Sequence, residues 1–128
     1  MPQFGVSDFK KLSVWQKAYA LAIDAHRVAS GIRGAEYLSL KSQIIRAASS
    51  IPANIVEGRA QPSSKSFSRY LTIAVNSASE LEFHLIMAKD IGVITMKDYV
   101  VLLTNLIEVR KMLYGLLNHL RLTSVPTP

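Results

Sequence analysis

The segment 43–58, QIIRAASSIPANIVEG, constrains the fold of this chain more than any other stretch. Ile44, Ile51 and Ile55 recur at helical spacing, which predicts an amphipathic helix with one buried face. Pro52 stands inside that helix, where it lacks an amide proton and its ring clashes with a carbonyl group of the preceding turn, a penalty of ~3 kcal/mol. Such a helix forms only where neighbouring elements offset the penalty, so the segment predicts a closely packed tertiary structure.

Pro52 also predicts the shape of its helix. A proline in a helix interior bends the axis, and we expect a kink at this position in a helix over residues 37–57. Ser49 and Ser50 are placed to donate hydrogen bonds to the carbonyl groups that the proline leaves free. The sequence leaves open the alternative that the chain forms two separate helices that meet at Pro52.

Apolar residues at helical spacing fill four segments of the chain, and no run alternates apolar and polar residues for long enough to suggest a strand. In the first segment this spacing predicts that Trp15 and Tyr19 lie in the core. The connections between the four segments are short, which forces consecutive helices to run antiparallel. We therefore predict an all-α fold, an antiparallel up-down-up-down four-helix bundle. It forms one domain over residues 1–128, with helices over 14–30, 37–57, 64–90 and 96–122 and a frayed tail over 123–128.

The expected helix ends rest on capping residues. Serine and threonine side chains accept hydrogen bonds from the free amides of a helix start, and glycine readily ends a helix. A serine with a glutamine three residues later has the form of a capping box. The expected start residues are Ser13 with Gln16, Ser63 and Thr95, and the expected stops are Gly31, Gly58 and Gly92.

The composition excludes several classes of protein. Cysteine is absent from the 128 residues, which excludes disulfides, thiolate metal sites and thiol nucleophiles and is compatible with a reducing cytoplasm. The first eight residues show no signal-peptide pattern, and no uncharged apolar run approaches the ~20 residues of a membrane span. We expect a soluble, cytoplasmic protein that does not contact a membrane.

Polar and charged side chains follow the apolar faces of the second and third predicted helices. Because an unpaired buried charge is strongly destabilising, we expect Glu57 and Glu80 to pair with Arg46 or Arg69. Arg110, inside the apolar arc of the fourth helix, needs an acid or an aromatic face as partner. The predicted structural polar network consists of Gln43, Arg46, Asn54, Glu57 and Glu80.

No residue pattern indicates an enzyme, a cofactor or a metal. The acids of the predicted network have no histidine beside them, and the chain contains no glycine-rich phosphate loop. His26, His84 and His119 fall on three different predicted helices, without H-x-x-x-H or E-x-x-H spacing. We therefore expect no catalytic residues, no metal site, no cofactor and no small-molecule substrate.

Three motifs, LSVWQKA at 12–18, LSLKSQIIRAASSIPANIVEG at 38–58 and SASELE at 77–82, resemble the four-helix-bundle proteins encoded in intervening sequences of bacterial 23S rRNA genes. Val56 departs from the family pattern, which usually has alanine there. The resemblance implies the bundle fold and a family whose function is largely undefined. The family is distantly similar to the accessory variability proteins of diversity-generating retroelements, pentameric rings that bind nucleic acid and a reverse transcriptase. By analogy, that likeness implies a ring of five subunits with RNA or DNA as a partner.

The third and fourth predicted helices are more apolar than an isolated bundle requires. Contiguous exposed apolar patches usually mark subunit contacts, so we expect a homo-oligomer. The alternative is that these broad apolar faces simply belong to the core. The candidate interface residues are Ile73, Phe83, Met87, Val101, Val109, Met112 and Leu116.

The net charge of +6 falls almost entirely at one end of the predicted bundle. Antiparallel helices bring together the start of the first helix, the turn between the second and third, and the end of the fourth. The turn, residues 59–66, contains no acid and leads into a helix N-terminus, which favours phosphate. Charges balance at the opposite end. The candidate nucleic-acid-binding residues are Lys10, Lys11, Lys17, Arg59, Lys65, Arg69 and Arg121.

The favoured interpretation is a non-enzymatic oligomeric bundle that binds the RNA or DNA backbone through this basic end, with strong salt dependence and weak sequence preference. Phe67 and Tyr70 lie near the basic turn and are candidates for stacking on a base, although core packing is the favoured role for both. The alternative is a protein–protein interaction scaffold without a nucleic-acid role, whose extra apolar faces bind a different protein.

Overall fold

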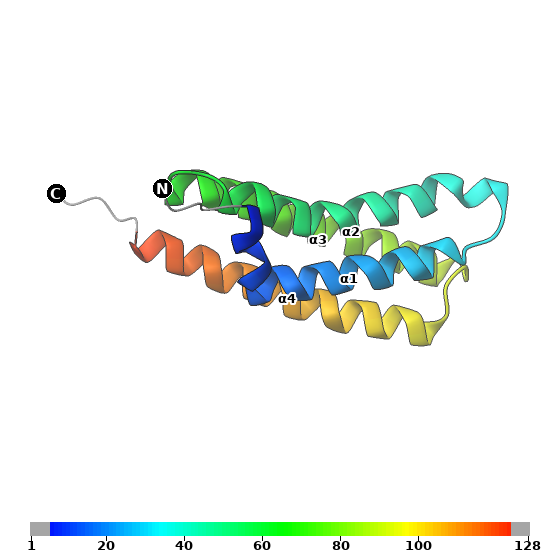
Figure 1. Cartoon of the computed structure of the whole chain (residues 1–128). Helices are drawn as coiled ribbons and strands as arrows, with labels where there is room; N and C mark the ends of the chain where they lie inside the picture. Colours follow the sequence, from blue (N-terminus) through cyan, green and yellow to red (C-terminus); the bar gives the residue numbers. More distant parts are fainter. Residues whose placement is uncertain (1–5, 124–128) are drawn as a thin grey trace.

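A computed structural model describes residues 6–123 of the chain. Within that range the long helices are α1 (Ser13–Ser30), α2 (Leu38–Arg59), α3 (Ser64–Asp90) and α4 (Met96–Thr123), and no strand is formed. Two 3-10 helices, η1 (Val6–Lys11) and η2 (Ala35–Tyr37), precede α1 and α2. The predicted all-α four-helix bundle is confirmed (Figure 1). Of the tail expected to fray, only Thr123 is described, as the last residue of α4; residues 124–128 lie outside the described range.

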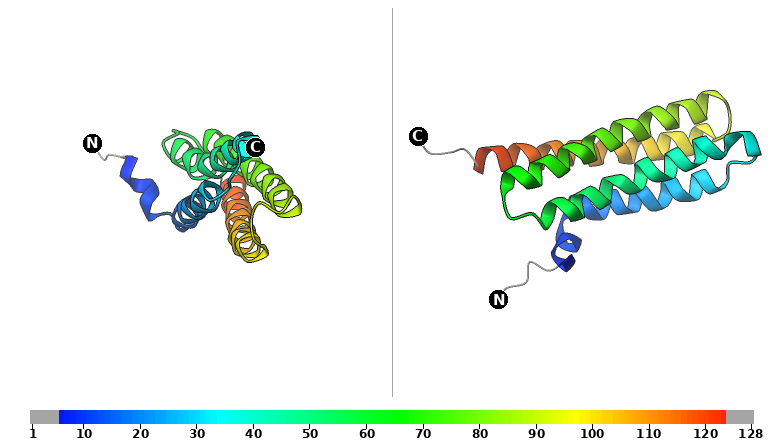
Figure 2. Two further views of the ribbon diagram at one scale, coloured as in Figure 1. Left: turned by 90° about the vertical axis from the view of Figure 1, so that its right-hand side faces the viewer. Right: turned by 90° about the horizontal axis from the view of Figure 1, so that it is seen from above.

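The chain reverses direction at each connection between long helices (Figure 1). α1 and α3 each pack against α2 and α4, and the contact between α2 and α3 is the most extensive. η1 lies at the side of the bundle, against α1 and α2 (Figure 2). The α2–α3 turn and the end of α4 lie at one end of the bundle, α1 begins further in from that end, and the α1–α2 and α3–α4 connections lie at the other end (Figure 1).

Leucine, isoleucine and alanine side chains from all four helices form one core, and each large aliphatic side chain contributes ~1.5–3 kcal/mol by its burial. Val109, expected at an oligomer interface, is 1% exposed, so that assignment is wrong. Tyr19, expected in the core, is 49% exposed. The largest fully buried side chains are Leu21, Ile44, Ile51, Ile55, Leu71, Leu81, Leu85, Leu102, Leu106, Val109 and Leu113.

Two of the three expected serine and threonine caps are confirmed. Ser63 Oγ accepts a hydrogen bond from the Ser66 amide at 3.1 Å, and Thr95 Oγ1 accepts one from the Asp98 amide at 3.0 Å. The expected capping box at Ser13 is wrong, because Leu12 is the N-cap of α1 and no side chain caps it. Gln16 Nε2 instead donates a hydrogen bond of 2.8 Å to the carbonyl oxygen of Lys10. That bond ties the end of η1 to the first turn of α1.

Pro52 lies inside α2, which is one continuous helix from Leu38 to Arg59, so the alternative of two separate helices is wrong. The proline ring is buried. Asn54 Nδ2, two residues further on, donates hydrogen bonds to the Ser50 carbonyl oxygen at 2.8 Å and to Ser50 Oγ at 3.0 Å. The kink at Pro52 stays a prediction.

Partly buried polar contacts join α2 to α3 and α3 to α4. Ser50 Oγ lies 2.7 Å from Ser77 Oγ, and Ser77 is the one buried polar residue in the described range. Arg110 Nη1 lies 2.8 Å from Glu82 Oε1, which confirms that Arg110 has an acidic partner. These two contacts fix the relative heights of α2, α3 and α4.

The predicted polar network is wrong in most of its members. Arg46, Glu57 and Glu80 are exposed, and none of them forms an ion pair with another described residue. Water solvates these charges, so the penalty that pairing was expected to relieve does not arise. Gln43 is half-buried and makes no side-chain hydrogen bond within the described range, which leaves Asn54 as the member that takes part in a network.

Gly58 was expected to end its helix, but α2 continues to Arg59 and Gly58 is buried. A Cβ atom at this position would lie 2.7 Å from Phe67 Cδ1 and 3.0 Å from Tyr70 Cβ. The glycine is therefore required because α2 and α3 approach closely next to their shared turn. In contrast, a Cβ atom at Gly115 in α4 would have no neighbour within 4 Å.

The two glycines predict opposite effects of one substitution. Gly58→Ala should lower the free energy of unfolding by about 1–3 kcal/mol, because the backbone-bound Tyr70 Cβ cannot move away. Gly115→Ala should raise it by roughly 0.5–1 kcal/mol, since alanine favours the helix and meets nothing. Urea unfolding followed by circular dichroism measures both. Stabilisation by Gly58→Ala would contradict the close approach of α2 and α3.

Ser77 predicts a second stability difference. Ser77→Ala should lower the free energy of unfolding by about 1 kcal/mol, because it removes the Ser50 contact from a buried site. Ser79→Ala, on the exposed side of the same helix, should change it by less than about 0.5 kcal/mol and is the control. Equal effects of the two substitutions in urea unfolding would show that the Ser50–Ser77 contact does not stabilise the bundle.

Candidate nucleic-acid interface

The elements that carry the predicted basic residues lie toward one end of the bundle, with η1 at its side and the start of α1 further in than the α2–α3 turn (Figures 1 and 2). η1 supplies two lysines, the start of α1 one, the last residue of α2 an arginine, the first turns of α3 two cations, and the end of α4 one arginine. Every member except Arg59 is exposed. By element the residues are Lys10 and Lys11, Lys17, Arg59, Lys65 and Arg69, and Arg121.

The interhelical contacts set three of these arginines at a common height. The Arg110–Glu82 ion pair aligns the antiparallel helices α3 and α4. Arg121 lies 11 residues after Arg110, which brings it level with the position 11 residues before Glu82, residue 71. Arg121 therefore lies close to the height of Arg69. The Ser50–Ser77 contact aligns α2 with α3 in the same way. Arg59 lies nine residues after Ser50, so it is level with the position nine residues before Ser77, residue 68. Three adjacent helices therefore each present one arginine at about the same level.

Arg59 differs from the other cations in its surroundings. Its side chain is half-buried at the α2–α3 turn, and its Nε atom is buried without a hydrogen-bond partner in the described range. Gly58, immediately before it, lies against Phe67. Arg59 is therefore the one candidate cation whose side chain is partly covered within the described residues.

Lys17 lies apart from the arginines, on the seam between α1 and α4. It lines a cleft of about 260 Å³ with Lys111 and Glu108 of α4. From the sequence, Lys111 falls in the middle of the predicted bundle and outside the candidate interface. Only the register between α1 and α4 brings Lys111 beside Lys17, and that register is not encoded in either helix alone.

The candidate interface residues on α3 and α4 fall into three groups. Ile73, Phe83, Met87 and Val101 are between 41% and 55% exposed. Met112 and Leu116 are half-buried and pack against the core, and Val109 is inside it. Ile91, at the C-cap of α3, continues the apolar stripe of Ile73, Phe83 and Met87 that the sequence indicates, and it is also exposed. Exposed apolar side chains of α4 that were not singled out from the sequence are Met96, Val100, Ile107, Tyr114 and Leu122.

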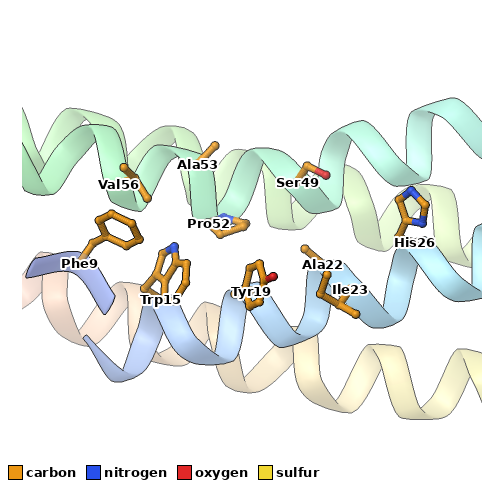
Figure 3. A pocket seen from close by; sticks show the side chains of 10 residues that line it. All are labelled: Phe9, Trp15, Tyr19, Ala22, Ile23, His26, Ser49, Pro52, Ala53 and Val56. Carbon is orange, nitrogen blue, oxygen red and sulfur yellow. The ribbon is translucent and has the colours of Figure 1, made fainter. Parts of the chain in front are cut away.

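An apolar groove of about 370 Å³ runs between α1 and α2 beside η1 (Figure 3). The Trp15 ring stacks on Tyr19, with ring centroids 5.0 Å apart and planes at 13°, and the Phe9 ring meets Trp15 edge-on at 4.9 Å. Sequence reasoning missed the groove because it assigned Trp15 and Tyr19 to the core. The lining residues are Phe9, Trp15, Tyr19, Ala22, Ile23, His26, Ser49, Pro52, Ala53 and Val56.

The described residues form neither a metal site nor a membrane-spanning helix. Among residues 6–123, no group of three or more histidines or acids is arranged to hold a metal ion. No helix in that part of the chain is long and apolar enough to cross a membrane.

Comparison with known proteins places this geometry in a family. A comparison with proteins of curated function found no match. The chain is similar to a crystal structure of a protein with unknown function from the S23 ribosomal protein family of Bacteroides thetaiotaomicron. The TM-score is 0.76 and the sequence identity 26%, over 81% of this chain and 97% of that one. Residues 10–115 match the family described as 23S rRNA-intervening sequence protein. The chain therefore belongs to the family of 23S rRNA-intervening sequence proteins.

Proposed function

We propose that this protein is a non-enzymatic, oligomeric bundle that binds the backbone of RNA or DNA through its basic end. The observation that carries the proposal is that exposed cations of α3 and α4 lie toward one end of the bundle, with the exposed lysines of η1 and α1 further in on the same half (Figure 1). Charges of one sign on a common surface attract a polyanion more strongly than the same charges dispersed. Binding of this kind releases counterions from the nucleic acid and is therefore salt-dependent.

The arginines that lie at about one height on α2, α3 and α4 support contact with the phosphate backbone of a nucleic acid more than recognition of base edges. Arg59, Arg69 and Arg121 come from three helices at about one height, so together they present a charged surface rather than a protruding element that enters a groove. A guanidinium group binds phosphate with paired N–H donors.

The exposed apolar side chains of α3 support the oligomeric part of the proposal. Ile73, Phe83 and Met87 recur along one side of the helix, and the largest of them, Phe83, is 55% exposed. Burial of this stripe against a second copy would remove it from water. In a ring of such subunits, like the ring of five that the distant relatives imply, the basic ends would repeat around the axis and bind one polyanion together.

The same apolar stripe favours the second candidate function, a scaffold that binds a different protein. In that case the stripe would be covered by a heterologous partner, and the basic end would only keep the protein soluble. The two candidates differ in the mass of the purified protein and in its affinity for nucleic acid.

Charge reversal at the basic end tests the main proposal. The double variant Lys65→Glu, Arg69→Glu should weaken binding of a labelled oligonucleotide by at least about tenfold in moderate salt. It should also flatten the plot of log K against log salt by roughly 0.7 for each phosphate of a single strand that the variant no longer neutralises. Fluorescence anisotropy at several salt concentrations measures both quantities.

The matched control is the double variant Arg33→Glu, Lys97→Glu, which makes the same change in net charge with two exposed residues of the balanced end. It should weaken binding far less and leave the salt dependence unchanged. If the two variants lose equal affinity, net charge rather than the basic end governs binding. If the unaltered protein binds no oligonucleotide, the proposal is wrong.

Removal of the apolar stripe tests the oligomer. The double variant Phe83→Gln, Met87→Gln should give a smaller assembly than the unaltered protein in size-exclusion chromatography with light scattering, with helix content unchanged. The control Leu38→Gln, Met96→Gln alters two comparably exposed apolar residues outside the candidate interface and should leave the mass unchanged. A monomeric unaltered protein would contradict the oligomer and favour the scaffold.

A further inference from the structure

We propose that the groove between α1 and α2 receives an unpaired base of a single-stranded nucleic acid, whose phosphates lie on the cations beside the groove. This inference rests on the proposed function and goes further, because it assigns single strands as the preferred ligand and a base as the group recognised. It follows from four features of the groove: its size, its aromatic rings, its free polar groups and the charge at its margin.

The groove has the size and lining of a small-ligand site. Its volume of about 370 Å³ lies near the lower limit of such sites, which hold about 300–1,000 Å³. Ala22, Ala53 and Val56 form apolar walls, and the buried ring of Pro52 forms part of the α2 side. The space suits one flat ring with its sugar better than a folded segment of another protein.

Aromatic rings are already arranged as a stack on one side of the groove (Figure 3). Trp15 and Tyr19 lie one helical turn apart on α1 with nearly parallel planes, and Tyr19 is 49% exposed. The Phe9 ring contacts the Trp15 ring in an edge-on arrangement. Bases stack on such rings whatever their sequence, because every base has a π-face. The stack in the free protein is therefore a platform that a base can extend.

Polar groups without partners border the apolar walls. Figure 3 shows the indole nitrogen of Trp15 turned toward α2 and Ser49 on the opposite wall. Within the described residues, neither the Trp15 N–H nor the Ser49 hydroxyl forms a hydrogen bond. The edges of a base offer both donors and acceptors, so both groups would find partners there. An acyl chain or an apolar side chain would leave them unpaired.

Cations follow lining residues of the groove in the sequence, both in η1 and on α2. Lys10 and Lys11 directly follow Phe9, and both are exposed. The Gln16 side chain donates a hydrogen bond to the Lys10 carbonyl oxygen, and this bond fixes the end of η1 next to the start of α1. On α2, Arg59 follows Val56 by three residues, about one helical turn. A strand whose base enters the groove would thus meet positive charge where its flanking phosphates leave it, a match that a neutral or cationic ligand lacks.

Trp15 provides the probe that tests the inference, because it is the single tryptophan of the chain. A single-stranded oligothymidylate should quench its fluorescence in step with binding measured by anisotropy. An abasic strand of equal length carries the same phosphates without bases, so it should bind the basic end and leave the emission unchanged. A blunt duplex, whose bases are already stacked, should behave like the abasic strand.

The outcomes separate the inference from the proposed function. If the intact strand binds without changing Trp15 emission, or if the abasic strand quenches it equally, the base site is wrong while binding through the basic end stands. If none of the three ligands binds, the proposed function fails and the base site fails with it.

A variant that fills the groove gives an independent test. Ala53 is exposed and lines the groove, so Ala53→Leu should occupy the space and lower the affinity for oligothymidylate by about tenfold, with the affinity for the abasic strand unchanged. The control Ala20→Leu makes the same change at an exposed α1 position that does not line the groove. Equal affinity of Ala53→Leu and the unaltered protein for oligothymidylate would overturn the inference.

Discussion

The close approach of α2 and α3 is the constraint on which the rest of the structure depends. Gly58 leaves room for Phe67 and for the backbone-bound Cβ of Tyr70 at the turn between them. The Ser50–Ser77 contact then fixes the register of the two helices along their length. Because short side chains allow short distances between helix axes, neither contact would survive larger residues at these positions. This register sets Arg59 at about the height of Arg69.

The opposite side of α2 packs less closely against α1. Small residues such as Ala22 and Ala53 leave the space between the two helices partly open, and Trp15 with Tyr19 only borders it. The two sides of α2 therefore differ in how closely they are packed. Its side toward α3 is filled and rigid, and its side toward α1 carries the groove to which we assign a base. The cations of η1 and of the α2 end lie where these two parts of the surface meet.

Much of the architecture could be predicted from the sequence, because helix formation is encoded locally. The recurrence of apolar residues identified four helices, and the caps at Ser63 and Thr95 marked where two of them start. The rotation of each helix was harder to predict. α4 is apolar around most of its surface, so nothing in its own sequence showed that Val109 faces the core. α1 is rotated so that Leu21 is buried and Tyr19 is not.

The sequence by itself determined the all-α class, the four helical segments and the surplus of positive charge, because each depends on residue types and their local spacing. Only the tertiary structure decided which charges share a height, which acids stay in water and where a groove opens. Those properties depend on the register and rotation of helices that are far apart along the chain. Glu80 and Glu82 illustrate the difference: two residues apart on one helix, the first is exposed to solvent and the second is paired with Arg110.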